Sequence, residues 1–269
     1  MQRDEPPDDV PDRPLWVSIR GAGSPTVVFE AGGGEDSSVW SELEPEVRDR
    51  YRVRTMLYDR AGLGRSPPNP RPYRIDGEAD ALRLELDRHG ITTPVVLVAH
   101  SYGGFVATMV AGTDPRVTGV VLVDANLAGF FDDARTERLL ATYRPQFAAL
   151  EQAAPELAKV MIPVVEAYPA TVARLRQVDI PAATPIIDIV AERTWVETPE
   201  EIEAMRQAHR DFVAASPHRR AVFAEGSGHH VMRDRPEIVL AAIAEVVAAV
   251  RRRPLLAGRD EGPAFRNDL

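Results

Sequence analysis

Short apolar runs that alternate with helix-like stretches constrain the fold of this chain more than any other feature of its sequence. The helix-like stretches lie around residues 37–48, from residue 77 and from residue 236. The apolar runs are rich in β-branched residues and bounded by turn-forming residues, as buried strands are; they lie near residues 26, 52, 95, 119, 185 and 221. Strands that alternate with helices are joined by right-handed crossovers in a mostly parallel, doubly wound sheet. We therefore predict an α/β fold.

One interval breaks this alternation. From Asn126 to Ala183 the chain is helix-like and amphipathic, and it contains several prolines but no strand candidate. Ordinary crossover helices are one interpretation, but the interval is longer than a simple crossover needs. We predict a helical cap, or lid, inserted before the last two strands. We expect a core at residues 1–125, the cap at 126–183, the rest of the core at 184–253 and a flexible tail at 254–269, with residues 1–13 also frayed.

The composition excludes several classes of protein. The formal net charge is −9, which disfavours nucleic-acid binding because that binding rests on clustered cations. The chain has no cysteine, so disulfides, thiolate metal sites and a cysteine nucleophile are excluded. No apolar run approaches the length of a membrane span, and the acidic N-terminus has no apolar signal core. These features predict a cytoplasmic protein with no nucleic-acid or membrane partner, and they leave its oligomeric state open.

Residues 99–104, A-H-S-Y-G-G, carry the strongest local signal. They directly follow an apolar strand candidate and directly precede a helical stretch, so Ser101 lies between a strand and a helix. A serine with small residues two positions away on either side is typical of a strained strand-to-helix turn that exposes its hydroxyl. The alternative is that Ser101 only caps the following helix.

This segment resembles the G-x-S-x-G nucleophile elbow of the α/β-hydrolase superfamily, with Ala99 in place of the first glycine. Residues 58–66, Y-D-R-A-G-L-G-R-S, are similar to a D-x-x-G-x-G-x-S motif of the same family, and we interpret Asp59, Arg60 and Ser66 as its structural supports. The resemblance covers most of residues 14–252. It implies the α/β-hydrolase fold with Ser101 as nucleophile, and it argues against dehalogenase or epoxide hydrolase chemistry, in which the nucleophile is an aspartate.

A serine hydroxyl needs an adjacent imidazole to take its proton, and the chain has six histidines. The order of catalytic residues in this fold places the base last, which points to E-G-S-G-H-H at residues 225–230. That segment is similar to the family's G-H-x-x-x-x-x-x-P-E signature, which implies His229 as the base and His230 as the alternative. We expect His100 to pack beneath the elbow. The other three histidines are expected to be solvated: His89, His209 and His218.

The acid that orients the base has two candidates. Family members commonly take it from the end of the strand after the cap, where this chain offers Glu192. A known variant takes it from the end of the strand before the cap, where V-L-V-D-A places Asp124. We favour Asp124, because a carboxylate there can orient the imidazole and stabilise its charged form. Asp124 could instead be a turn former after its strand.

An acyl-transfer enzyme also needs hydrogen-bond donors for the oxyanion. The resemblance implies the backbone N–H of Tyr102, which follows the nucleophile, and that of Gly33 in the turn A-G-G-G-E at residues 31–35. That turn is similar to the family's H-G-x loop, with Ala31 in place of the histidine. A simple turn is the alternative, and the run lacks the ending of a phosphate-binding loop.

Together these motifs predict a serine carboxylic-ester hydrolase. We expect a hydrophobic ester or lactone as substrate, with the apolar runs 126–131 and 160–165 lining an acyl pocket or forming the core of the cap. Thioester or amide hydrolysis with the same residues remains an alternative, as does a non-hydrolytic protein of this fold, such as a ligand receptor or a perhydrolase. The mechanism requires no metal or organic cofactor.

Overall fold

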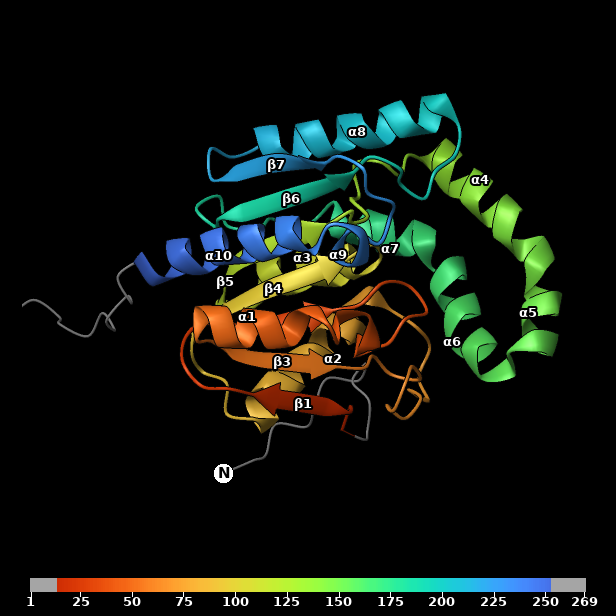
Figure 1. Cartoon of the computed structure of the whole chain (residues 1–269). Helices are drawn as coiled ribbons and strands as arrows, with labels where there is room; N and C mark the ends of the chain where they lie inside the picture. Colours follow the sequence, from red (N-terminus) through yellow and green to blue (C-terminus); the bar gives the residue numbers. More distant parts are fainter. Residues whose placement is uncertain (1–13, 253–269) are drawn as a thin grey trace, which may run out of the picture.

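The computed structural model describes residues 14–252 (Figure 1). The tails predicted for residues 1–13 and 254–269 lie outside the described residues. Seven strands form one sheet in the order β1-β3-β2-β4-β5-β6-β7, in which only β1 runs antiparallel to its neighbour. Their bounds are β1 Val17–Arg20, β2 Thr26–Glu30, β3 Arg54–Tyr58, β4 Val95–His100, β5 Val117–Val123, β6 Ile186–Ala191 and β7 Arg219–Ala224. The predicted α/β-hydrolase fold with a mostly parallel sheet is confirmed.

The six predicted strands are all present, and one strand was missed. β1, with the sequence V-S-I-R, pairs antiparallel with β3 at the edge of the sheet. Its side chains are only partly buried, so it lacks the continuous apolar run that marks the buried parallel strands.

Helices cover both faces of the sheet. α1 (Leu43–Tyr51) and α10 (Pro236–Arg252) pack on one face, whereas α2 (Ile75–Arg88), α3 (Gly103–Thr113) and α8 (Pro199–Ala214) pack on the other. The helix predicted around residues 37–48 is in fact two elements, the 3₁₀ helix η1 (Ser37–Trp40) and α1. α1 begins only at Leu43, which leaves Pro45 in its first turn, where a missing N–H is tolerated.

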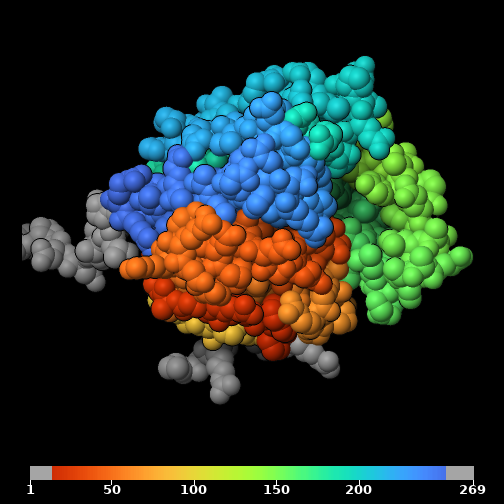
Figure 2. Space-filling model, viewed as in Figure 1, coloured from red at the N-terminus to blue at the C-terminus, as the bar shows by residue number. Residues whose placement is uncertain are grey.

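The interval between β5 and β6 folds into helices, as predicted. Its elements are α4 (Asp133–Tyr143), η2 (Arg144–Gln146), α5 (Phe147–Ala153), α6 (Pro155–Glu166) and α7 (Tyr168–Leu175). These cap helices form an arc beside the carboxyl ends of the parallel strands (Figure 1), and in the space-filling view they are set off from the core by a recessed band (Figure 2). α9 (Val231–Asp234) lies between β7 and α10. Within residues 14–252, no helix combines the length and the apolar character that crossing a membrane requires.

Candidate active site

Ser101 occupies a strained turn between β4 and α3. Its φ is +51°, in the left-handed region that residues other than glycine rarely adopt. The turn is held by hydrogen bonds to the next strand: the Ser101 N–H donates to Val123 O at 3.2 Å, and the Asn126 N–H donates to Ser101 O at 2.8 Å. The strain therefore lies at the residue whose hydroxyl the turn presents.

The two glycines after the elbow are required by close packing. A Cβ at Gly103 would lie 2.6 Å from Ala31 O, and a Cβ at Gly104 would lie 2.6 Å from the Ala125 Cβ. Real Cβ atoms do not approach other atoms this closely, so side chains at either position would push the elbow away from β2 or from the segment after β5. The small residues of the motif thus let the start of α3 approach its neighbours.

His229 lies in the loop between β7 and α9, at the carboxyl edge of the sheet. Its Nε2 is 2.9 Å from Ser101 Oγ, and its Nδ1 is 2.6 Å from Asp124 Oδ2. A neutral imidazole that donates from Nδ1 to a carboxylate has its lone pair on Nε2. His229 is therefore oriented to accept the Ser101 hydroxyl proton.

Asp124 is buried at the end of β5 and adopts a φ of +43°. Its second carboxylate oxygen accepts a hydrogen bond from the Ala191 N–H at 3.1 Å. Burial on its own would raise the pKa of Asp124, but the hydrogen bond and charge of His229, together with the Ala191 N–H, outweigh burial and lower this pKa. The carboxylate thus stays ionised beside the imidazole.

The alternative acid, Glu192, does not contact His229. Its carboxylate accepts a hydrogen bond of 2.6 Å from the Gly226 N–H, so it binds the loop that leads to His229 rather than the imidazole itself. Of the two candidate acids, the structure brings only Asp124 within hydrogen-bonding distance of His229.

The turn after β2 lies beside the elbow. A Cβ at Gly33 would lie 3.4 Å from the Tyr102 Cβ, so the backbones of these two residues approach each other. Neither the Gly33 N–H nor the Tyr102 N–H donates a hydrogen bond to another group within residues 14–252. Arg60 fixes the turn, because its guanidinium forms an ion pair with Glu30 and donates to the carbonyl oxygens of Ala31 and Gly32 at 2.7 and 2.5 Å.

Asp59 and Ser66 also act as supports. The Asp59 carboxylate accepts hydrogen bonds from the backbone N–H of Ser37 and the side chain of Arg65, and the Ser66 hydroxyl donates to the carbonyl oxygen of Asp59. None of these groups contacts Ser101, His229 or Asp124 in the described chain. The interpretation of the 58–66 motif as structural agrees with these contacts.

A cavity of about 220 Å³ opens beside Ser101 and His229. Leu139, Tyr143, Met161, Val164, Val165 and Tyr168 of the cap line it, together with Gly33, Tyr102, Asn126 and Trp195. Asn126 links the cap to the segment after β6. Its amide donates to Tyr168 Oη at 3.2 Å, and its oxygen accepts from Trp195 Nε1 at 3.1 Å. The run 160–165 therefore contributes to the cavity, whereas Phe130 and Phe131 of the run 126–131 are buried in the core.

One of the other histidines is not where it was expected. His209 is buried, and its Nδ1 is 2.7 Å from Oδ2 of the buried Asp188; the expectation that it is solvated was wrong. The charged residues around it on α8 suggested exposure, but α8 packs on β6 and β7, and a buried partner for His209 comes from a distant segment. His89 and His218 are exposed, as expected.

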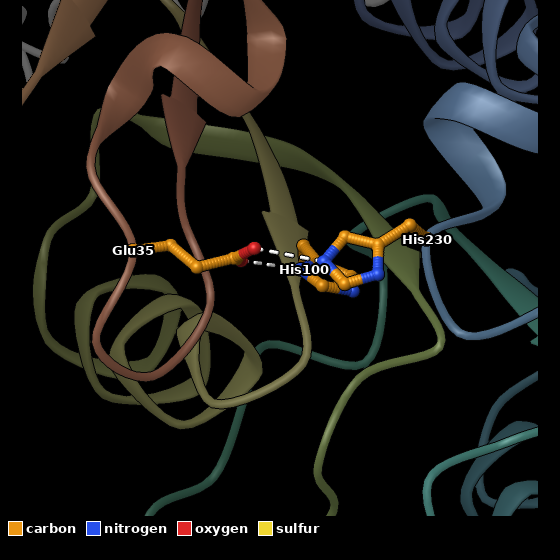
Figure 3. Close-up of side chains that lie close together, drawn as sticks. All are labelled: Glu35, His100 and His230. Carbon is orange, nitrogen blue, oxygen red and sulfur yellow. Dashed lines mark hydrogen bonds and ion pairs between the residues drawn. The ribbon is translucent and has the colours of Figure 1, made fainter.

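His100 is buried, and it belongs to a cluster that sequence reasoning missed. Glu35 contacts both His100 and His230: one carboxylate oxygen lies 3.1 Å from His100 Nδ1, and the other lies 2.8 Å from His230 Nε2. Each residue offers one potential metal-ligand atom, and these atoms all lie within 4.8 Å of one another (Figure 3). The only signals in the sequence were the acidic residue that ends the glycine turn and the second histidine of the His-His pair.

Comparisons with known proteins identify the family and the fold. The sequence profile described as the alpha/beta hydrolase family matches residues 27–242. A Bacillus subtilis protein, YqjL, described as uncharacterized, is 26% identical over 231 residues that cover 86% of each chain. Among solved structures, a thermophilic esterase from Thermogutta terrifontis has a TM-score of 0.62 at 23% identity and covers 88% of this chain and 93% of its own.

A structure reported with the carboxylesterases of Nitrososphaera gargenis has a TM-score of 0.65 at 18% identity, over 88% of this chain and 95% of its own. Structural similarity at such low identity establishes the fold, and the profile match extends over most of the chain. With a profile match from β2 to α10, the chain belongs to the alpha/beta hydrolase family.

Proposed function

We propose that this protein is a serine hydrolase that cleaves a carboxylic ester or a lactone through an acyl-enzyme on Ser101. The observation that carries the proposal is the continuous hydrogen-bonded chain from Asp124 through His229 to the Ser101 hydroxyl. A nucleophile, a base with the correct tautomer and a buried anion that orients the base are the parts that acyl transfer to serine requires.

In the proposed reaction, Ser101 Oγ attacks the substrate carbonyl carbon while its proton moves to His229 Nε2. The tetrahedral intermediate collapses when this proton passes to the leaving alkoxide, which departs as an alcohol or, in a lactone, stays attached to the acyl group. Water then attacks the acyl-enzyme and gives a proton to His229, and this proton passes to Ser101 Oγ as the bond from the acyl carbon to Ser101 breaks and the acid leaves. Asp124 stabilises the imidazolium that forms in both steps without taking its proton.

The backbone N–H groups of Gly33 and Tyr102 are proposed to bind the oxyanion. Their freedom from hydrogen bonds within residues 14–252 supports this role, because a donor that is already paired gains little when charge develops on the substrate. Arg60 supports the turn, since it donates to the carbonyl oxygens of Ala31 and Gly32 and so favours a peptide orientation in which the Gly33 N–H faces the site. Preorganised donors of this kind account for about 3–4 kcal/mol each in acyl transfer.

The cap helices are proposed to act as a lid that defines the acyl pocket. Six of the residues around the cavity come from α4, α6 and α7, and most of these side chains are apolar. The volume of about 220 Å³ is below the range of roughly 300–1,000 Å³ typical of sites for drug-sized ligands. These features support a compact, mainly apolar ester or lactone as the substrate.

Labelling with a fluorophosphonate probe, followed by intact-mass measurement, tests the proposal. The wild-type protein is expected to gain one adduct, while Ser101→Ala gains none, because the probe reacts only with an activated serine. A panel of p-nitrophenyl esters, a thioester and an anilide identifies the preferred bond. If the folded wild type remained unlabelled and turned over no ester, the hydrolase proposal would be abandoned in favour of ligand binding.

Truncation of a cap side chain should change the preferred acyl length. Met161 lines the cavity and packs near Gly33, so Met161→Ala enlarges the pocket. We expect the ratio of kcat/KM for octanoyl over butyryl p-nitrophenyl esters to rise by about tenfold, since one or a few methylene groups in an apolar pocket discriminate on this scale. Val160→Ala is the matched control, because Val160 is adjacent on α6 but faces Gly62 instead of the cavity. An equal change in both variants would contradict the assignment of the acyl pocket.

A further inference from the structure

Three segments that build the candidate active site also contribute a second cluster of side chains, formed by Glu35, His100 and His230. Glu35 ends the glycine turn, His100 directly precedes the nucleophile, and His230 directly follows the base. In Figure 3 the Glu35 carboxylate points toward both imidazole rings, which reach it from separate elements. None of the three residues lines the cavity beside Ser101, so the cluster is distinct from the substrate site.

The hydrogen bonds of His100 leave one of its nitrogens without a matching partner. Its Nε2 lies 3.1 Å from the carbonyl oxygen of His229, which can only accept, so this nitrogen must carry the proton. The other nitrogen, Nδ1, lies 3.1 Å from Glu35 Oε2, which is also an acceptor when ionised. A neutral His100 therefore directs a lone pair at a carboxylate oxygen.

The surroundings favour that neutral ring over an imidazolium. His100 is 1% exposed, and burial disfavours the charged form of an imidazole. A neutral imidazole and an ionised carboxylate are the protonation states that bind a divalent cation.

We propose that Glu35, His100 and His230 bind a first-row divalent metal ion, with Zn²⁺ as the preferred ion. Two imidazoles and one carboxylate form a nitrogen-rich donor set that suits Zn²⁺ and disfavours Mg²⁺ and Ca²⁺, which prefer oxygen ligands. Zinc bonds of about 2.0–2.2 Å place neighbouring ligand atoms roughly 3.0–3.5 Å apart. The Glu35 contacts of 3.1 and 2.8 Å are made by its two different oxygens, and the ligand atoms of the three residues all lie within 4.8 Å of one another, so modest side-chain shifts bring them to this spacing.

The supporting contacts match those of a metal-binding histidine. Such a histidine almost always donates its other ring N–H to a carbonyl or carboxylate, as His100 does toward the His229 carbonyl oxygen. Glu35 is itself held by the Gly32 N–H, at 3.1 Å from Oε2. The side chains of Glu35 and His230 are 23% and 38% exposed, so water can enter and complete a four-coordinate site.

The position of the cluster indicates what the ion does. It joins the glycine turn, the segment before Ser101 and the loop that carries His229, and none of its three residues lines the substrate cavity. The bound ion therefore cross-links these three segments and fixes their positions relative to one another. Binding of the ion does not depend on ester hydrolysis. The proposed site differs from the expectation drawn from the sequence, which was that no metal is bound.

Titration of metal-free full-length protein with Zn²⁺ in a calorimeter tests this proposal. We expect one site per chain, a higher Tm in the presence of Zn²⁺ because the ion binds only the folded state, and a visible absorption band when Co²⁺ replaces Zn²⁺. Glu35→Gln and His230→Gln should each weaken Zn²⁺ binding by more than tenfold, since even residues that only support a ligand contribute about 10- to 100-fold.

Two histidine variants serve as controls. His218→Gln removes an exposed imidazole outside the cluster, and His229→Gln removes the imidazole that faces Ser101 while keeping the backbone carbonyl that holds His100. Both should retain the wild-type Zn²⁺ affinity within about twofold. If Glu35→Gln does not fold, as judged by circular dichroism, His230→Gln decides the outcome, because its side chain is the more exposed of the two. Absence of saturable binding, binding unchanged in His230→Gln, or binding lost in His229→Gln would each overturn the proposal.

Discussion

Replacing His229 by glutamine is expected to lower kcat/KM for p-nitrophenyl esters by about 10⁵- to 10⁶-fold, with little change in stability. Glutamine keeps much of the side-chain volume but cannot take the Ser101 proton, so attack on the carbonyl loses its general base. A loss of this size corresponds to about 7–8 kcal/mol of transition-state stabilisation. Steady-state kinetics across a series of ester concentrations measures it, and thermal unfolding monitors the fold.

The experiment also decides between the two adjacent histidines. In the structure, the His229 imidazole contacts Ser101 Oγ and Asp124, whereas the His230 imidazole contacts Glu35. A larger loss of activity in His230→Gln than in His229→Gln would contradict the assignment of His229 as the base. Fluorophosphonate labelling should fall in parallel with ester turnover in His229→Gln, since both need an activated Ser101.

Replacing Asp124 by asparagine is the second large effect, with an expected loss of about 10⁴-fold in kcat. Asparagine fits the space but cannot stabilise the imidazolium, and its amide group favours the His229 tautomer that places the proton on Nε2, facing Ser101. KM should change little, because Asp124 is buried and does not line the cavity. Burst and steady-state measurements with a p-nitrophenyl ester separate this effect on chemistry from one on binding.

Glu192→Gln is the matched control for Asp124→Asn. Glu192 also lies at the carboxyl edge of the sheet, but its carboxylate contacts the Gly226 N–H. Glutamine retains an oxygen that can accept this hydrogen bond, so kcat should stay within about twofold of the wild type. If Glu192→Gln lost 10³-fold or more while Asp124→Asn remained active, the proposed acid would be wrong.

Several features of this protein followed from local sequence alone. Buried parallel strands need continuous apolar runs, so six of the seven strands were predicted from composition over a few residues. The elbow at Ser101 is equally local, because a strained turn between a strand and a helix requires small neighbours within two residues. The family resemblance rested on the order of such motifs, and the profile match over residues 27–242 confirms it.

Other features depended on contacts between segments far apart in the sequence. Asp124 and Glu192 end neighbouring parallel strands, β5 and β6, so both reach the same edge of the sheet, and local pattern could not select between them. The choice depends on the path of the loop after β7, which brings His229 to Asp124 across 105 positions of sequence. No local preference encodes a contact of that kind.

The burial of His209 and the meeting of Glu35, His100 and His230 have the same origin. Each imidazole lies beside a carboxylate that is distant in the sequence, and charge patterns along one helix or loop do not reveal such partners. The sequence by itself determined the six buried strands and the strained turn at Ser101, because those depend on neighbouring residues. The tertiary structure alone decided which side chains meet at the carboxyl edge of the sheet, because that depends on how crossovers and loops bring separate strand ends together.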